Sequence, residues 1–183
     1  MAGCFVAIVG PSGVGKDTLI GHARAALAGR DGYLFVRRMV TRAANAFEDH
    51  DTIGEDEFAA GHAAGTFALS WRAHGLGYAL PGDAVTAIGG GSVAICNLSR
   101  GAIPEARRRF ARVLVVRVSA PPEVLAERLA KRGRETAEAV AERLRREAVR
   151  DSEYPADLVV MNDRPVAITG GELVEFLSRL REG

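Results

Sequence analysis

The chain has 183 residues, 48% of them hydrophobic, and a formal net charge of +1 at pH 7. These values predict one globular domain with its own core, and they argue against a broad basic surface for nucleic acid or membrane. We also expect a cytoplasmic protein, because no apolar stretch approaches membrane-spanning length and the N-terminus lacks the pattern of a signal peptide. Cys4 and Cys96 lie in apolar runs and are predicted to be buried thiols. The sequence indicates no oligomeric state.

The chain begins with a predicted strand followed by a glycine-rich loop. Residues 4–9 form a continuous apolar run, typical of a strand that is covered on both faces. The loop and the helix start that follow are predicted to bind the phosphates of ATP through Gly10, Pro11, Ser12, Gly13, Val14, Gly15, Lys16, Asp17 and Thr18. Glycines let backbone N–H groups surround a phosphate, and a helix predicted over 17–27 directs its positive dipole end at the same place. Lys16 would reach the β- and γ-phosphates, and it is one of only two lysines among 24 basic residues.

The residue after the loop lysine departs from the general motif. That position usually holds Ser or Thr, whose hydroxyl ligates Mg²⁺, but here it is Asp17, with Thr18 next. A carboxylate is a hard anionic ligand that suits Mg²⁺ at least as well as a hydroxyl. We therefore predict a Mg²⁺ ligand at Asp17 or Thr18 and leave the choice between them open.

Further along the chain, strand and helix patterns alternate. Strands are predicted over residues 92–97, 113–118 and 158–161, and helices over 104–110, 121–130, 136–149 and 171–181. This alternation predicts an α/β fold with a parallel sheet flanked by helices and right-handed crossovers. Two segments do not fit it, namely residues 33–80 and the arginine-dense segment 128–150.

Several motifs resemble guanylate kinase in their order and spacing. They are residues 10–13, Val40-Thr41-Arg42 followed by Glu48, Gly75-Leu76-Gly77-Tyr78, the arginines Arg128, Arg132 and Arg143, and residues 158–163. The resemblance implies a single P-loop kinase domain over residues 1–183. Its core would be 1–32, 81–127 and 151–183, with an acceptor-binding insertion at 33–80. An arginine-rich lid at 128–150 would close over ATP and expel water.

The groups that read guanine in that family are missing. Leu69 stands where an acid is expected from the spacing to Tyr78, residues 97–100 contain no acid, and Asn45 replaces a second acceptor arginine. A leucine facing a base edge leaves buried donors without partners, which rejects a ligand strongly.

Other motifs resemble one branch of the family, the ribose 1,5-bisphosphate phosphokinases. These motifs are Gly15-Lys16-Asp17, Trp71-Arg72-Ala73-His74-Gly75-Leu76, residues 97–100 and Arg132-Gly133-Arg134-Glu135. The resemblance implies that ATP phosphorylates the 1-phosphate of ribose 1,5-bisphosphate, giving 5-phospho-α-D-ribose 1-diphosphate and ADP. A substrate with two phosphates and no base fits a pocket with more positive charge and fewer acids.

The same resemblance implies roles for individual residues. Lys16, Arg132 and Arg143 would be catalytic, since arginine suits phosphate oxygens and the attacking phosphate needs no general base. The acceptor would be held by Arg42, Arg72, His74 and Tyr78, with Arg37 or Arg38 as weaker candidates. Each arginine could instead be an ordinary surface or ion-paired side chain. His74 could equally brace its loop, and Trp71 is better explained by packing.

Two other functions compete with this interpretation. A guanylate or other nucleoside monophosphate kinase would share the fold, but Leu69 and the acid-free stretch 97–100 argue against it. A non-catalytic module that binds phosphorylated partners would typically lose the phosphate loop, which this chain keeps. We expect a small-molecule substrate, with ATP and Mg²⁺ as cofactors and no nucleic-acid or membrane partner.

Overall fold

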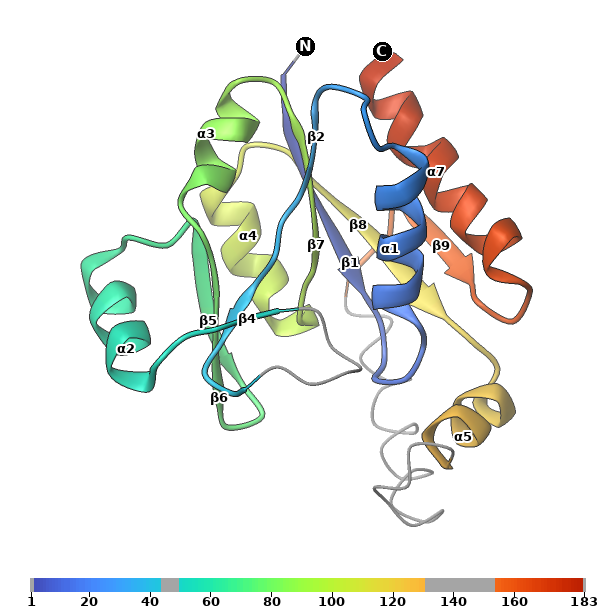
Figure 1. The fold of residues 1–183 in the computed structure, drawn as a ribbon, viewed down its shortest axis with the longest axis horizontal. Coiled ribbons are helices and arrows are strands. Elements are labelled where there is room, and N and C mark those ends of the chain that lie inside the picture. Colours follow the sequence, from blue (N-terminus) through green and yellow to red (C-terminus); the bar gives the residue numbers. More distant parts are fainter. Residues whose placement is uncertain (1, 44–49, 131–153, 183) are drawn as a thin grey trace.

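The computed structural model describes residues 2–43, 50–130 and 154–182 (Figure 1). The helix predicted over 136–149, Asn45, Arg132 and Arg143 lie outside the described residues. Within the described ranges no helix is long and apolar enough to cross a membrane.

A five-stranded parallel sheet forms the centre of the fold. Its strands are β2 (Tyr33–Phe35), β7 (Val93–Asn97), β1 (Cys4–Val9), β8 (Val113–Ser119) and β9 (Leu158–Met161), in that spatial order. Every neighbouring pair is parallel. Every residue of β1 is buried, as its continuous apolar sequence requires in the middle of such a sheet. The α/β fold with a parallel sheet is therefore confirmed.

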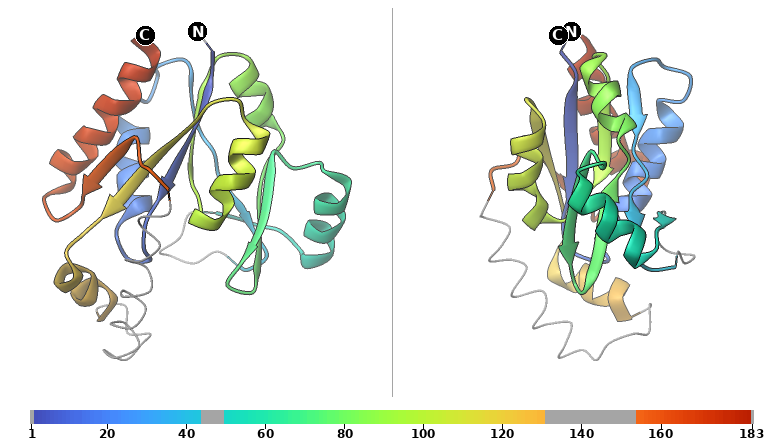
Figure 2. Two further views of the ribbon diagram at one scale, coloured as in Figure 1. Left: turned by 180° about the vertical axis from the view of Figure 1, so that it is seen from behind. Right: turned by 90° about the vertical axis from the view of Figure 1, so that its left-hand side faces the viewer.

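Helices cover both faces of this sheet (Figure 2). They are α1 (Lys16–Ala26), α3 (Asp83–Gly89), α4 (Ile103–Arg109) and α7 (Val166–Glu182), with a short 3-10 turn, η1 (Arg100–Ala102), before α4. Helix α5 (Pro122–Ala130) lies beyond the edge of the sheet at which the glycine-rich loop is found. Residues of β1 alternate between two cores. Val6 and Ile8 pack with α1 and α7, whereas Phe5 and Ala7 pack with α3 and α4. In Figure 1 both chain ends lie at the edge of the sheet opposite the glycine-rich loop.

A second, smaller sheet stands beside the first. Its order is β4 (Asp51–Thr52), β3 (Met39–Val40), β6 (Leu76–Leu80) and β5 (Leu69–Ala73). Helix α2 (Glu55–Ala64) covers one face through the fully buried Phe58, which clusters with Ala79. Side chains on the other face join the core that contains Phe5, so the two sheets share apolar packing.

Most predicted elements are confirmed within one residue at each end, and both cysteines are buried thiols. Three differences stand out. Residues 33–35, which the sequence placed in the insertion, pair with β7 in the main sheet. Helix α3 was not predicted, and α7 begins at Val166, five residues before the predicted start. The division into core, insertion and lid stays a prediction.

Candidate active site

The glycine-rich loop joins the end of β1 to the start of α1, at the carboxyl edge of the sheet. Lys16 is the first residue of α1, and its Nζ donates hydrogen bonds to the carbonyl oxygens of Gly10 at 2.8 Å and Pro11 at 3.0 Å. The lysine therefore lies across the loop. Its ammonium group and the N-terminus of α1 lie at the same loop, an arrangement that suits a bound anion.

Gly15 can be replaced only with strain. Its φ is +95°, and a Cβ on it would lie 2.5 Å from Nδ2 of Asn162. Both the left-handed backbone and this close approach require glycine at the helix N-cap.

Asn162 connects the glycine-rich loop to α7 through hydrogen bonds. Its Nδ2 donates to the carbonyl oxygen of Val14 at 2.7 Å, and its Oδ1 accepts from Oγ1 of Thr169 at 3.0 Å. Asn162 and Thr169 are both buried. Arg128 Nη1 adds a bond of 3.3 Å to the same Val14 carbonyl. Sequence reasoning noted residue 162 as part of a family motif but missed Thr169, which lies in α7 and is joined to the loop only by the fold.

Asp17 faces the end of β7. Its Oδ1 accepts a 2.8 Å hydrogen bond from Nδ2 of Asn97, the last residue of that strand. Thr18 is exposed. One half-buried carboxylate beside a phosphate loop fits Mg²⁺, which is usually held by one or two carboxylates together with substrate phosphates and water. No group of three or more His, Cys, Asp and Glu side chains suited to a metal occurs within 2–43, 50–130 and 154–182.

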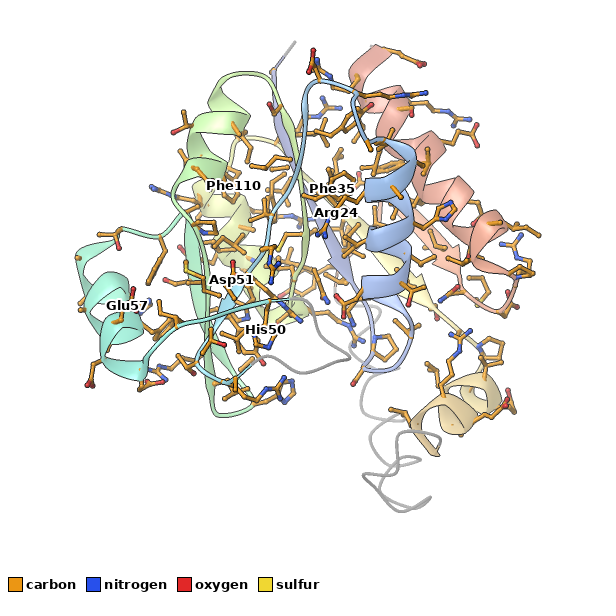
Figure 3. All side chains as sticks on the ribbon, viewed as in Figure 1. Arg24, Phe35, His50, Asp51, Glu57 and Phe110 are labelled. Atoms are coloured by element: carbon orange, nitrogen blue, oxygen red, sulfur yellow. The ribbon has the colours of Figure 1, made fainter. Side chains whose placement is uncertain are left out.

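A small polar cleft of about 40 Å³ opens beside Asp17. It is lined by Asp17, Ile20, Gly21, Arg24, Val36, Arg37, Arg38 and Asn97. Figure 3 shows Arg24 of α1 beside Phe35 of β2, and the Arg24 guanidinium lies 5.8 Å from the centre of the Phe35 ring. Arg37 pairs with Asp51 of β4 at 3.1 Å. The cleft therefore lies between α1 and the segment that leads into the second sheet, and three arginines line it.

Tyr78 lies on the face of the second sheet that joins the shared core. Its ring stacks on Trp71, with ring centres 5.3 Å apart, and the guanidinium of Arg38 lies 5.7 Å from the Tyr78 ring centre. Leu69 belongs to the same buried cluster and is only 3% exposed. The position at which a guanine-reading acid was sought is thus an apolar core position.

The structure does not bring Arg72 together with Tyr78. Trp71 pairs with Tyr78, so the next residue of β5, Arg72, points to the opposite face. There its guanidinium forms an ion pair with Glu55 of α2 and lies 4.9 Å from the ring centre of Phe58. The hydrogen bond from Arg72 lowers the pKa of Glu55. A role for Arg72 in binding the acceptor stays a prediction, and it would require the side chain to leave Glu55.

The other predicted acceptor residues lie at the ends of strands. His74 is exposed at the turn between β5 and β6, with a φ of +52°. Gly75 follows it with a φ of +74°, which is the backbone of a tight two-residue hairpin turn. Arg42 is half-buried just after β3, and its carbonyl oxygen accepts from Oγ1 of Thr52 at 3.4 Å. The turn between β5 and β6 therefore accounts for His74 without a contact to the acceptor.

Comparison with known proteins identifies the family. The chain is 50% identical over 177 residues to ribose 1,5-bisphosphate phosphokinase PhnN of Methylobacterium radiotolerans, covering 97% of this chain and 98% of that protein. It is 46% identical over 181 residues to the protein of the same name from Brucella melitensis, covering 98% and 93%. The chain belongs to the ribose 1,5-bisphosphate phosphokinase family. Its membership makes the protein a kinase, that is, a phosphate-transferring enzyme, as the resemblance implied.

A comparison with solved structures identifies the fold. Guanylate kinase from Anaplasma phagocytophilum superposes with a TM-score of 0.69 at 16% identity, covering 97% of this chain and 86% of that one. No protein-family model matches the chain. The ribose 1,5-bisphosphate phosphokinase family thus shares the P-loop kinase fold, while the identity is too low to carry guanylate kinase chemistry to this chain.

Proposed function

We propose that the protein transfers the γ-phosphoryl group of ATP to the 1-phosphate of ribose 1,5-bisphosphate, with Mg²⁺, giving 5-phospho-α-D-ribose 1-diphosphate and ADP. The observation that carries the proposal is the 50% identity, over nearly the whole chain, to a phosphokinase named for this substrate. The intact phosphate loop supports the kinase part. The absence of an acid at Leu69 and in the stretch 97–100 supports an acceptor without a base.

In the proposed reaction the protein positions phosphates and neutralises charge. An oxygen of the acceptor's 1-phosphate forms a bond to the γ-phosphorus, the bond from that phosphorus to the bridging β-phosphate oxygen breaks, and ADP leaves with the electron pair. Because the attacking oxygen is already ionised at neutral pH, no general base is required. Catalysis then depends on alignment and on donors aimed at the developing charge.

Residues at the loop would hold the donor. The loop amides and Lys16 bind the β- and γ-phosphates, and binding replaces the carbonyl partners that Lys16 has at Gly10 and Pro11. Asp17 is the better Mg²⁺ ligand of the two candidates, since its carboxylate lines the cleft whereas Thr18 does not. When bound, Mg²⁺ offsets the negative charge of the phosphates. Asn97 orients the Asp17 carboxylate, which would hold the metal, by donating a hydrogen bond to its Oδ1.

Other residues would hold the acceptor and the transferring group. Arg42 and Tyr78 bind the acceptor. Arg132 and Arg143, which lie outside the described residues, neutralise the charge of the transferred phosphoryl group. Arginine suits both tasks because its planar fork bonds two phosphate oxygens at once.

The test is a measurement of ADP release with ribose 1,5-bisphosphate, ribose 5-phosphate and GMP as separate acceptors. We expect turnover with the sugar bisphosphate and a kcat/KM for GMP lower by at least about 100-fold, since neither residue 69 nor the stretch 97–100 offers an acid to accept from the donors of guanine. Faster turnover of GMP would establish a guanylate kinase instead. ATP hydrolysis without dependence on any of the acceptors would refute both functions.

A further inference from the structure

Arg38 has a property that the assigned site residues do not explain. It lines the cleft beside Asp17, and its Nε is buried with no hydrogen-bond partner among the described residues. A buried donor without a partner costs free energy, and the cost is larger when the donor belongs to a charged group. Native structures rarely keep such a donor without reason, so an acceptor brought by a ligand is the natural partner.

A second unpartnered donor lies next to the same ring. Nε1 of Trp71 is also buried without a hydrogen-bond partner in the described part of the chain. Arg38 and Trp71 both contact Tyr78, at 5.7 Å and 5.3 Å between the group centres. The surroundings of Tyr78 thus offer N–H donors that need acceptors. A phosphate presents only acceptors, whereas a guanine edge also presents donors, which this region would leave unpaired.

The position of Arg38 indicates which phosphate it would meet. Arg38 shares its cleft with Asn97, which begins the acid-free stretch 97–100. In the proposed function Arg42 holds the reacting phosphate of the acceptor, and Arg42 is not among the residues that line this cleft. Arg38 therefore faces a different part of the acceptor from Arg42, and a base-free acceptor has its second phosphate to offer there.

Spacing along the chain agrees with two separate phosphate contacts. Arg38 precedes β3 and Arg42 follows it by two residues. Four residues of extended chain span at most about 13 Å, and the chain bends at Thr41 and Arg42, so the two backbone positions are separated by less than that. Two long arginine side chains on this scaffold can reach the two ends of a pentose bisphosphate without competing for one phosphate.

We propose that Arg38 binds the second, non-reacting phosphate of a sugar bisphosphate and so selects acceptors that carry two phosphates. The proposal rests on the proposed function for its substrate, and it adds the residue that would determine specificity. Arg38 bonds the phosphate oxygens through its fork while it remains stacked on Tyr78.

The experiment is calorimetric titration of the full chain with Mg²⁺-ADP present, using two sugar monophosphates as probes. Ribose 5-phosphate carries only the non-reacting phosphate, and ribose 1-phosphate carries only the reacting one. We expect Arg38→Met to weaken binding of ribose 5-phosphate by about 10- to 100-fold, the loss of charge-assisted hydrogen bonds. The Kd for ribose 1-phosphate should stay within about twofold of the parental value, because this probe lacks the phosphate that Arg38 binds. Arg107→Met, the same substitution on the exposed side of α4, should change neither.

The possible results separate cleanly. An equal loss for both probes, a loss for ribose 1-phosphate alone, or no loss would overturn the assignment. If Arg38→Met does not fold, Arg38→Lys replaces it. The lysine keeps the positive charge but lacks the planar guanidinium, so it should weaken the binding of ribose 5-phosphate only. Turnover of ribose 1,5-bisphosphate by the unchanged protein is measured beside these titrations. Absence of that turnover refutes the proposed function, whereas the contrast between the two probes decides the role of Arg38.

Discussion

Removing the hydroxyl group of Thr169 tests how the fold supports the phosphate loop. Oγ1 of Thr169 donates to Oδ1 of Asn162, and Nδ2 of the same amide donates to the Val14 carbonyl in the loop. Thr169→Val keeps the shape of the side chain but leaves Oδ1 of Asn162 buried without this donor. Because Thr169 has no exposed surface, water does not replace the lost hydrogen bond in the native packing.

The magnitude follows from these contacts. A lost neutral hydrogen bond and an unsatisfied buried acceptor together cost about 1–3 kcal/mol of unfolding free energy. For a chain of this size, each kcal/mol lowers Tm by about 2–4 °C, so we expect a decrease of about 2–12 °C. The Asn162 amide also loses the contact that fixes its orientation beneath Val14. We therefore expect the Kd for Mg²⁺-ATP to rise by about 3- to 10-fold, equivalent to about 1 kcal/mol.

Thermal unfolding and ATP titration of Thr169→Val measure the two effects. The matched control is Thr66→Val, whose hydroxyl donates to the Gly61 carbonyl at the exposed end of α2. The control should stay within about 0.5 kcal/mol of the parent and bind ATP unchanged. If Thr169→Val lowers Tm but leaves ATP affinity at the parental value, Thr169 stabilises the fold without orienting the loop, and the reasoning is wrong.

Three further predictions concern the loop and the core. Lys16→Ala and Asp17→Asn should both fold yet lose at least about 100-fold in turnover, because the first removes a positive charge from the reacting phosphates and the second removes the proposed Mg²⁺ ligand. Near-parental rates from both variants would refute these roles. Gly15→Ala should lose ATP affinity in calorimetry, since its Cβ would meet Asn162 Nδ2 at 2.5 Å with φ at +95°, and unchanged affinity would contradict this. Burial raises the pKa of Cys96 to about 12, so a thiol reagent at pH 8 should not react quickly with native protein, whereas fast labelling of Cys96 would show that the core opens.

The phosphate loop and the central strands could be predicted because their signals are local. A strand buried on both faces is apolar throughout, as in β1, and the loop needs glycine and lysine at fixed spacings. The start of α7 was misplaced because Gly170 and Gly171 weaken a helix pattern. Gly170 is nevertheless helical, and a Cβ on it would lie 2.4 Å from the ring of His22 on α1. The close approach of the two helices explains that glycine, and the contact is not visible in the sequence.

The acceptor residues were harder to predict because they depend on pairing between distant strands. The contacts of Arg38 and Trp71 with Tyr78 arise only when β3, β6 and β5 align in one sheet. The orientation of Arg72 could have been predicted from the sequence. Adjacent residues of a strand point to opposite faces, so Arg72 could not share the face of Trp71 once the strand is recognised.

The central claim is that the acceptor is a sugar bisphosphate whose 1-phosphate becomes a diphosphate. Phosphorus NMR of the purified protein with Mg²⁺-ATP and ribose 1,5-bisphosphate tests it most directly. The account predicts a new pair of coupled diphosphate resonances beside those of ADP, with the 5-phosphate resonance retained as a monophosphate. Formation of GDP from GMP, with no diphosphate formed from the sugar, would contradict it.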